Sequence, residues 1–295
     1  ICGYHGWHDW YLSANLNKKN NLASHLLSDL KTRGVPGELK NTVFPFRYNN
    51  FEELMKIIKT NDIGIIMMEF SRNIDPNINF LKKIRRLCSR KKIVLIFDEC
   101  TSGFRQSFGG LHKLYNILPD MAIFGKCLGN GYAISAVIGK KKIMDSSQTS
   151  FNSSIFWGER IGFAASLKTL EVMESIKSWK TITKMGFYVR KKIKHLSLKH
   201  NIKIKIWGLP AMTGYTIEND NNNYFKTYIT QEMLKKGFIT GNCIFLCINH
   251  TKKIIDKYFF VLDGILDKIN KCKTKKEIKK LLDGSVSHTT FRRLN

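Results

Sequence analysis

The stretch Ile-Val-Leu-Ile-Phe-Asp, residues 93–98, is a continuous apolar run that ends in a carboxylate. Residues 63–69, Ile-Gly-Ile-Ile-Met-Met-Glu, have the same form. Short aliphatic and aromatic runs of this kind are typical of strands that are buried on both faces. Between them, residues 79–89 carry apolar side chains at helical spacing. The order strand, helix, strand predicts a βαβ unit and a mostly parallel sheet.

A third apolar run, residues 121–124, ends two residues before Lys126. Ligands of open α/β sheets bind in the crevice beyond the carboxyl ends of the strands. If the three strands are parallel neighbours, Glu69, Asp98 and Lys126 open onto the same crevice. We therefore expect two carboxylates and an amine, placed there by separate strands, to have a chemical role. The alternative is an ion pair that only closes the end of the sheet.

The remaining sequence predicts a second, smaller domain. A Gly-Asn-Gly turn at residues 129–131 is followed by a predicted strand, a polar loop and two helices, and then by an α+β region. The elements expected after the turn lie at residues 134–139, 147–154, 160–176, 177–200, 202–206, 212–217, 242–249 and 251–270. The fold class is therefore α/β, with domains at residues 1–175 and 176–295.

Several motifs form a recognisable set. Residues 98–105, Asp-Glu-Cys-Thr-Ser-Gly-Phe-Arg, look like an Asp-Glu-Val-x-[Ser/Thr]-Gly-Phe-Arg segment, and residues 125–131, Gly-Lys-Cys-Leu-Gly-Asn-Gly, look like a lysine signature. Residues 3–6, Gly-Tyr-His-Gly, look like a stacking motif, and residues 153–162 and 291–294 add further agreement. In this order, and over nearly the whole chain, the motifs resemble those of the class III pyridoxal-phosphate (PLP)-dependent aminotransferases. The resemblance is greatest to glutamate-1-semialdehyde 2,1-aminomutase-like proteins.

The resemblance implies a fold-type I PLP enzyme. Residues 1–175 would be the C-terminal portion of the large PLP-binding domain, whose N-terminal part is missing, and residues 176–295 the small domain. Lys126 would form the Schiff base with PLP and carry protons at the reacting carbon. Asp98 would face the pyridine nitrogen and keep it protonated. Tyr4 would stack on the ring.

Five further residues are implied as cofactor contacts. His5 lies inside the stacking motif and lines the cofactor, without an assigned chemical step. Glu69 would help to organise the cofactor pocket, although an ion-pair role stays open. Cys100 occupies the position of the family's ring-packing valine. Ser154 and Ile155 belong to a loop that would reach the phosphate in the other subunit of a homodimer with shared active sites.

The expected activity is transfer of an amino group, by an aminotransferase or an aminomutase. The partners would be a small-molecule amino donor and acceptor. Because no arginine can be placed over a substrate carboxylate, the substrate is either an amino acid or an amino or keto sugar precursor. The alternative is a catalytically impaired, truncated family member that needs a partner or an upstream segment to bind PLP. It rests on the start at Ile1 and on the lack of a recognisable Ser/Gly-Thr-Glu-Ala segment, whose helix start cradles the phosphate in the family.

Composition argues against some other classes of protein. Lysine and arginine outnumber aspartate and glutamate by 49 to 23, a net charge of +26. The lysines occur in small groups without aromatic interleaving, so we expect solvated faces rather than a nucleic-acid partner. A nucleic-acid-binding protein remains a third hypothesis, to be tested by salt-sensitive retention. Seven dispersed cysteines without a Cys-x-x-Cys pair predict reduced thiols, no metal site and a cytoplasmic protein. No apolar run has the length of a membrane span, so we expect no membrane partner.

Overall fold

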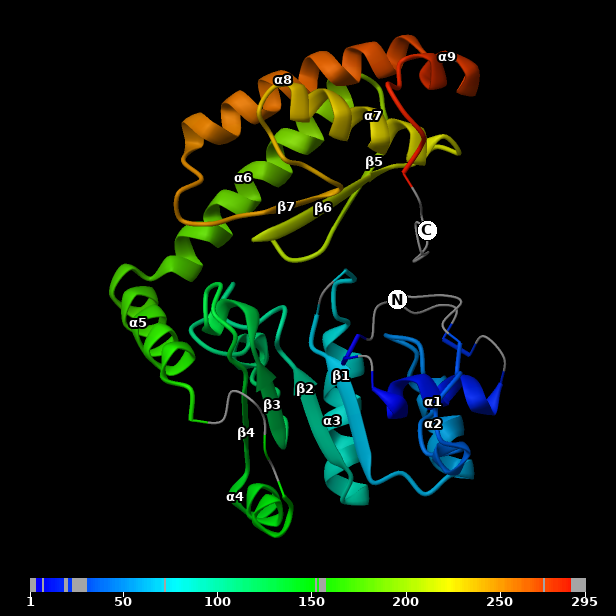
Figure 1. The fold of residues 1–295 in the computed structure, drawn as a ribbon, viewed down its shortest axis with the longest axis vertical. Helices are drawn as coiled ribbons and strands as arrows, with labels where there is room; N and C mark the ends of the chain where they lie inside the picture. The colour runs from blue at the N-terminus through cyan, green and yellow to red at the C-terminus, as the bar shows by residue number, and fades with distance from the viewer. Residues whose placement is uncertain are drawn as a thin grey trace. The chain divides into compact units, whose positions relative to one another are not determined.

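The chain forms two compact units, residues 1–179 and 180–295 (Figure 1). The structure is a computed structural model, and it describes residues 4–6, 8–18, 21–22, 31–71, 73–151, 153, 158–272 and 274–287. Each unit has its own sheet and its own helices. The two units are therefore described in turn.

The first unit is built on a four-stranded sheet. Its strands are β1 (Ile65–Glu69), β2 (Val94–Asp98), β3 (Met121–Phe124) and β4 (Ala136–Gly139), in the order β1-β2-β3-β4. The pairs β1–β2 and β2–β3 are parallel, as predicted, but β4 is antiparallel to β3. The sheet is thus mixed, and the prediction of a mostly parallel sheet is correct only for its first three strands. Residues 125–135, between β3 and β4, are too short for the crossover that a parallel connection needs.

The described part of the first unit also contains helices and short 3-10 turns. They are α1 (Asp9–Asn17), α2 (Phe51–Thr60), α3 (Ile78–Lys91), α4 (Lys141–Met144) and α5 (Arg160–Ile176), with 3-10 turns η1 (Gly37–Leu39), η2 (Leu111–Tyr115), η3 (Lys126–Leu128) and η4 (Asp145–Thr149). The α3 helix begins where the Asn77 side chain accepts from the backbone N–H of Asn79 at 3.0 Å and Phe80 at 3.3 Å. It ends at Lys92, which adopts the left-handed conformation.

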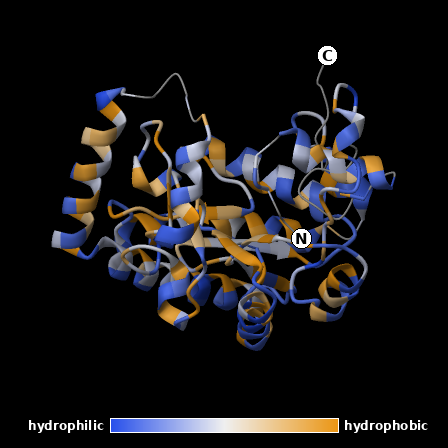
Figure 2. Cartoon of the chain, turned by 90° about the horizontal axis from the view of Figure 1, so that it is seen from below, coloured by the Kyte–Doolittle hydropathy of each residue, from blue (hydrophilic) through white to orange (hydrophobic). Residues whose placement is uncertain are grey.

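Apolar side chains of β2 and α3 form much of the core of the first unit. Leu95 and Phe97 of β2 have no exposed surface, and Phe97 meets the Phe70 ring edge-on at a centroid distance of 5.2 Å. On α3, apolar residues recur at helical spacing and are buried; they are Phe80, Leu81, Ile84, Leu87 and Cys88. Figure 2 shows helices with mixed hydrophilic and hydrophobic residues, as expected when one face packs and the other meets solvent.

Asp120 ties the amino end of β3 to three neighbouring elements. Its Oδ2 accepts from the Leu95 N–H at 2.9 Å and from Arg85 of α3 at 2.8 Å, and its Oδ1 lies 2.6 Å from Lys140 Nζ. Burial alone raises the pKa of Asp120, but the Lys140, Leu95 and Arg85 donors outweigh it and hold that pKa below its usual value. Asp120 is therefore a structural carboxylate, at the end of the sheet remote from Asp98.

The second unit contains a three-stranded antiparallel sheet and long helices. Its elements are α6 (Ser178–Lys199), β5 (Ile204–Trp207), β6 (Met212–Ile217), α7 (Asn222–Lys235), β7 (Cys243–Phe245), α8 (Lys252–Lys271) and α9 (Lys275–Lys280), and the strand order is β5-β6-β7. The β7 strand is shorter than the predicted strand at 242–249, and α7 was not predicted. One apolar cluster joins α6, β6, α7 and α8, with Val189, Tyr215, Met233 and Leu262 among its buried members.

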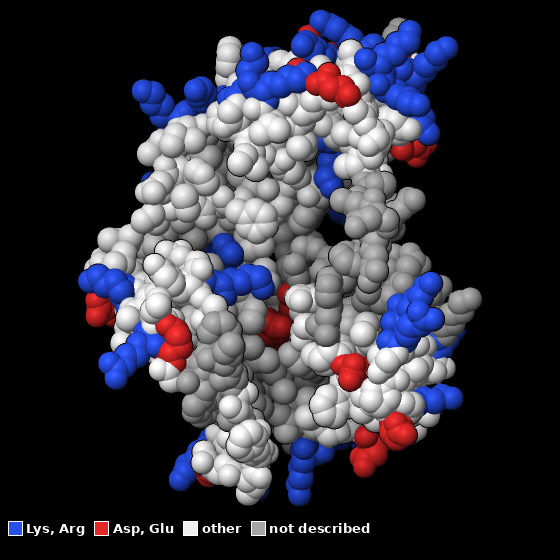
Figure 3. Space-filling view, in the orientation of Figure 1, with Lys and Arg blue, Asp and Glu red and all other residues white. Residues whose placement is uncertain are grey.

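Basic side chains gather over α8 and α9 (Figure 3). The lysines in this region lie on helix surfaces, in keeping with the expectation of solvated faces. Within the described part of the chain, no helix combines the length and the apolar character needed to span a membrane.

Candidate active site

The carboxyl ends of β1, β2 and β3 meet at one edge of the first sheet. Glu69 is in register with Asp98, and Asp98 is in register with Ile123 of β3, three residues before Lys126. Glu69 and Asp98 are each only 6% exposed. The structure therefore brings the predicted carboxylates side by side on adjacent parallel strands, and the chain that leaves β3 at the same edge carries Lys126.

Asp98 is held by two contacts. Its Oδ2 lies 2.8 Å from His5 Nδ1, and its Oδ1 accepts the backbone N–H of Cys100 at 3.0 Å. Burial by itself raises the pKa of Asp98, but the contact with His5 and the Cys100 N–H lower it by more, so the pKa lies below its ordinary value. Asp98 is therefore a carboxylate at neutral pH, with a fixed direction and a charge that a cationic ring nitrogen could face.

Lys126 occupies an unusual backbone position. Its φ is +43°, in the left-handed region that most non-glycine residues avoid. The Lys126 Nζ donates to the hydroxyl of Thr101 at 3.1 Å, and Thr101 is only 3% exposed. The turn that follows is tight, because a Cβ at Gly129 would lie 2.3 Å from the Tyr132 carbonyl oxygen. Backbone and hydroxyl together fix where the amine lies.

Cys100 packs against the glycine that precedes Lys126. A Cβ at Gly125 would lie 3.2 Å from Cys100 Sγ, so the two residues are close. Burial, and then the charge of Asp98, raise the pKa of the Cys100 thiol to about 11. The thiol is therefore uncharged at neutral pH, and it presents a small, soft apolar surface. This agrees with the valine that the family motif has at this position.

The other predicted contacts are placed less completely. Tyr4 is half-buried and directly precedes His5. Burial, and then the charge of Glu69, raise the pKa of Tyr48. Glu69 therefore acts electrostatically on this neighbour, whose hydroxyl donates to the Phe70 carbonyl. Ser154 and Ile155 lie outside the described residues. The phosphate-binding role of this loop stays a prediction.

Two contacts of the site were not predicted from the sequence. Thr101, the hydroxyl partner of Lys126, occupies a variable position of the motif, and only its place three residues after Asp98 could have drawn attention to it. His5 was assigned to the cofactor without a partner, and its contact with Asp98 spans 93 residues of sequence. A contact over that separation has no local signal.

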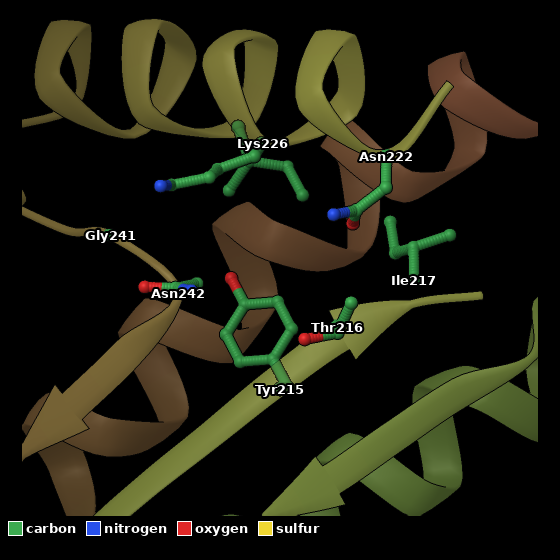
Figure 4. A pocket seen from close by; sticks show the side chains of 8 residues that line it. Tyr215, Thr216, Ile217, Asn222, Lys226, Gly241 and Asn242 are labelled. Carbon is green, nitrogen blue, oxygen red and sulfur yellow. The ribbon is translucent and has the colours of Figure 1, made fainter. Parts of the chain in front are cut away.

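A separate cavity lies in the second unit, between β6 and α7 (Figure 4). Tyr215, Asn222 and Lys226 line it, and its volume is about 20 Å³. That volume holds one water-sized molecule, not a cofactor or substrate. The strand ends of the first unit are therefore a better candidate for an active site than this cavity.

The chain belongs to the class III aminotransferase family, because the family model described as "Aminotransferase class-III" matches residues 48–260. This result confirms the family that the motifs indicated. The chain is 29% identical over 263 residues to a 3-aminobutyryl-CoA aminotransferase of Cloacimonas acidaminovorans, covering 84% of this chain and 59% of that protein. It is 30% identical over 292 residues to a glutamate-1-semialdehyde 2,1-aminomutase of Methanosphaera stadtmanae, covering 91% and 67%.

Solved structures show the same fold. The FumI protein of Sphingopyxis sp. MTA144, in its PLP internal aldimine form, superposes with a TM-score of 0.79 at 21% identity, over 95% of this chain and 67% of that one. An omega-transaminase from Sphaerobacter thermophilus gives a TM-score of 0.78 at 16% identity, over 90% and 68%. The chain spans 59% of the Cloacimonas protein and 67% of the Methanosphaera protein.

Proposed function

We propose that this chain transfers an amino group between small molecules with PLP as its cofactor, as an aminotransferase or an aminomutase. The observation that carries the proposal is the pairing of a charged carboxylate, Asp98, with an amine, Lys126, at the ends of adjacent strands. Each is oriented by its own partner, His5 for Asp98 and Thr101 for Lys126.

The side chains at the sheet edge fit the ring of PLP. Asp98 would face the ring nitrogen, with its low pKa keeping it negative. Tyr4 would cover one face of the ring, and the uncharged thiol of Cys100 the other. Lys126 would hold the carbonyl end. When bound, PLP supplies an electron sink that stabilises negative charge at the substrate carbon.

The chain's own residues would supply the proton transfer. Lys126 Nζ would take a proton from the substrate carbon that bears the amine, and return it at the second reacting carbon. Thr101 would keep Nζ within reach of both carbons, because its hydroxyl accepts from Nζ at 3.1 Å. The His5 contact would keep Asp98 turned toward the ring. Glu69, buried next to Asp98, would shape the pocket floor.

The substrates and the assembly are further parts of the proposal. The names of the relatives support both amino transfer and amino migration, and Lys126 and Asp98 would serve either reaction. An amino acid or an amino or keto sugar precursor would be the substrate. A homodimer is supported by apolar side chains exposed on α5, where Ile161, Phe163 and Leu167 are 56–64% exposed. The Ser154 and Ile155 loop would then reach the partner's phosphate.

The test is a titration of the full chain with PLP, followed by absorbance between 300 and 500 nm, about the range of bound PLP. We expect a new band in the wild type and its loss in Lys126→Ala. Lys142→Ala, which removes an exposed lysine of α4, is the matched control and should keep the band. A wild-type protein with no band, or a band that survives in Lys126→Ala, contradicts the proposal.

A further inference from the structure

A second cluster of buried polar side chains lies next to the candidate site, and the proposed chemistry does not use it. Glu99 follows Asp98 in the chain, and it has no exposed surface. Ser102 and His112 are buried beside it, at 1% and 7% exposure. A buried carboxylate needs matching donors, because an unpaired buried charge is strongly destabilising.

Both oxygens of the Glu99 carboxylate have such partners. The backbone N–H of His112 donates to Glu99 Oε1 at 3.0 Å, His112 Nδ1 lies 2.8 Å from the same oxygen, and the Ser102 hydroxyl donates to Oε2. The backbone of Glu99 is also held: its N–H donates to the Ile123 carbonyl at 2.8 Å, and its carbonyl accepts the Gly103 N–H at 2.8 Å. Glu99 therefore connects the turn after β2 to both β3 and η2.

The surroundings of the cluster leave little room for movement. A Cβ at Gly110 would lie 2.3 Å from His112 Cε1 and 3.0 Å from Glu99 Oε1. A Cβ at Gly103 would lie 2.7 Å from the Glu99 carbonyl oxygen and 2.9 Å from Phe124 Cδ1. Two positions beside the cluster are thus suited only to glycine. The close packing leaves the Glu99 side chain little space for another rotamer.

The turn that Glu99 anchors carries the groups of the candidate site. Asp98 precedes Glu99, and its Oδ1 accepts the Cys100 N–H at 3.0 Å. Thr101 follows and accepts from Lys126 Nζ at 3.1 Å. Successive side chains of an extended chain point to opposite sides, so Asp98 can face the site while Glu99 enters the interior.

We infer that Glu99 is a positioning residue of the amino-transfer site. Through the buried Ser102–Glu99–His112 cluster, it fixes the turn at residues 98–101, so that the Asp98 carboxylate keeps its direction and the Thr101 hydroxyl its contact with Lys126 Nζ. This role rests on the proposed function, and Glu99 itself contacts neither cofactor nor substrate.

The test compares three variants of the full chain. Glu99→Gln keeps the shape of the side chain and removes its charge. Ser102→Ala removes the hydroxyl that donates to Glu99 Oε2 and leaves the Glu99 carboxylate in place. It tests the positioning role if Glu99→Gln does not fold. Glu52→Gln, at an exposed position of α2, is the matched control.

Each variant is titrated with PLP to obtain Kd, and the pH midpoint of the Lys126-dependent absorbance band is recorded. Thermal unfolding without PLP reports the fold separately. We expect Glu99→Gln to raise Kd about tenfold, as the loss of an outer partner of a site residue commonly does. We expect Ser102→Ala to shift Kd in the same direction by less, and Glu52→Gln to match the wild type. The band midpoint of Glu99→Gln should move to lower pH, because a nearby negative charge is lost.

The outcomes separate this inference from the proposed function. The positioning role alone is overturned if Glu99→Gln folds and keeps the wild-type Kd and midpoint. If Glu99→Gln does not fold, the same result in a folded Ser102→Ala protein overturns it. A wild type without a Lys126-dependent band overturns the proposed function and the positioning role together. A double-mutant cycle of Glu99→Gln with Thr101→Val should give non-additive effects on Kd, because the two residues act on the same turn. Independent effects would also overturn the positioning role.

Discussion

Replacing Asp98 by asparagine tests the centre of the site with almost no change of shape. The Asp98 carboxylate meets the Cys100 N–H at 3.0 Å and His5 Nδ1 at 2.8 Å. A hydrogen bond to a charged group contributes about 1.5–3 kcal/mol. Asparagine keeps one carbonyl acceptor, so it can preserve one of the two contacts. We therefore expect the free energy of unfolding at pH 7 to fall by about 1.5–3 kcal/mol.

The stability difference between wild type and Asp98→Asn should also depend on pH. The pKa of Asp98 in the folded protein lies below its ordinary value. Its stabilising contribution is therefore complete above the unfolded-state pKa, about 3.9, and is lost as pH falls through the lower folded-state pKa. The difference between wild type and Asp98→Asn should be full at about pH 7 and should shrink as pH falls below about 3.9.

The assay is urea unfolding of the protein without PLP, followed by tryptophan fluorescence across that pH range. Asp62→Asn, at an exposed position after α2, is the control and should not change stability measurably. A loss below about 0.5 kcal/mol at pH 7, the scatter of ordinary surface substitutions, would refute the reasoning. A difference that does not change with pH would refute it as well. In the PLP titration, Asp98→Asn should raise Kd at least about tenfold, because a charge partner typically shifts a neighbouring pKa by about 1–3 units.

Three further predictions concern the same unit. Asp120→Asn should destabilise the protein by about 1.5–3 kcal/mol in urea unfolding, because Arg85 loses a charged acceptor, whereas Lys140 is 63% exposed and contributes little; a loss under about 0.5 kcal/mol would contradict this role. Gly110→Ala should cost about 1–3 kcal/mol, because its Cβ would lie 2.3 Å from a ring carbon; an unchanged melting temperature would show that the loop adjusts freely. Cys100 should resist iodoacetamide at pH 8, where a thiol of pKa about 11 is only about one part in a thousand thiolate; rapid labelling of Cys100 in peptide mass spectra would contradict the raised pKa.

Much of the first unit could be predicted because its strands are short, fully apolar runs. The β1 strand begins two residues later, and the β2 strand one residue later, than the apolar runs at 63–69 and 93–98, and both end at the predicted carboxylates. The α5 helix has the predicted bounds, Arg160–Ile176. The direction of β4 was missed, although the short connection after β3 argues against a parallel crossover.

The orientation of the site residues could not be predicted. The contact of His5 with Asp98 and the ion pair of Asp120 with Arg85 depend on tertiary packing between distant segments. The motif containing Asp98 indicated which residues matter, but not that Thr101 would contact Lys126. The α7 helix was missed because its apolar and polar residues do not separate into clear faces.

The left-handed backbone conformation of Lys126 lowers the stability of the fold at the residue whose amine has the proposed chemical role. A non-glycine residue in this conformation is disfavoured by about 1–2 kcal/mol, whereas glycine adopts it without that cost. Lys126→Gly and Lys126→Ala both lose the Thr101 contact, so comparing their melting temperatures isolates the backbone effect. Lys126→Gly should be the more stable variant, by about 1 kcal/mol. Stability alone would favour glycine at this position, and the proposed role of the Lys126 amine would account for a lysine there.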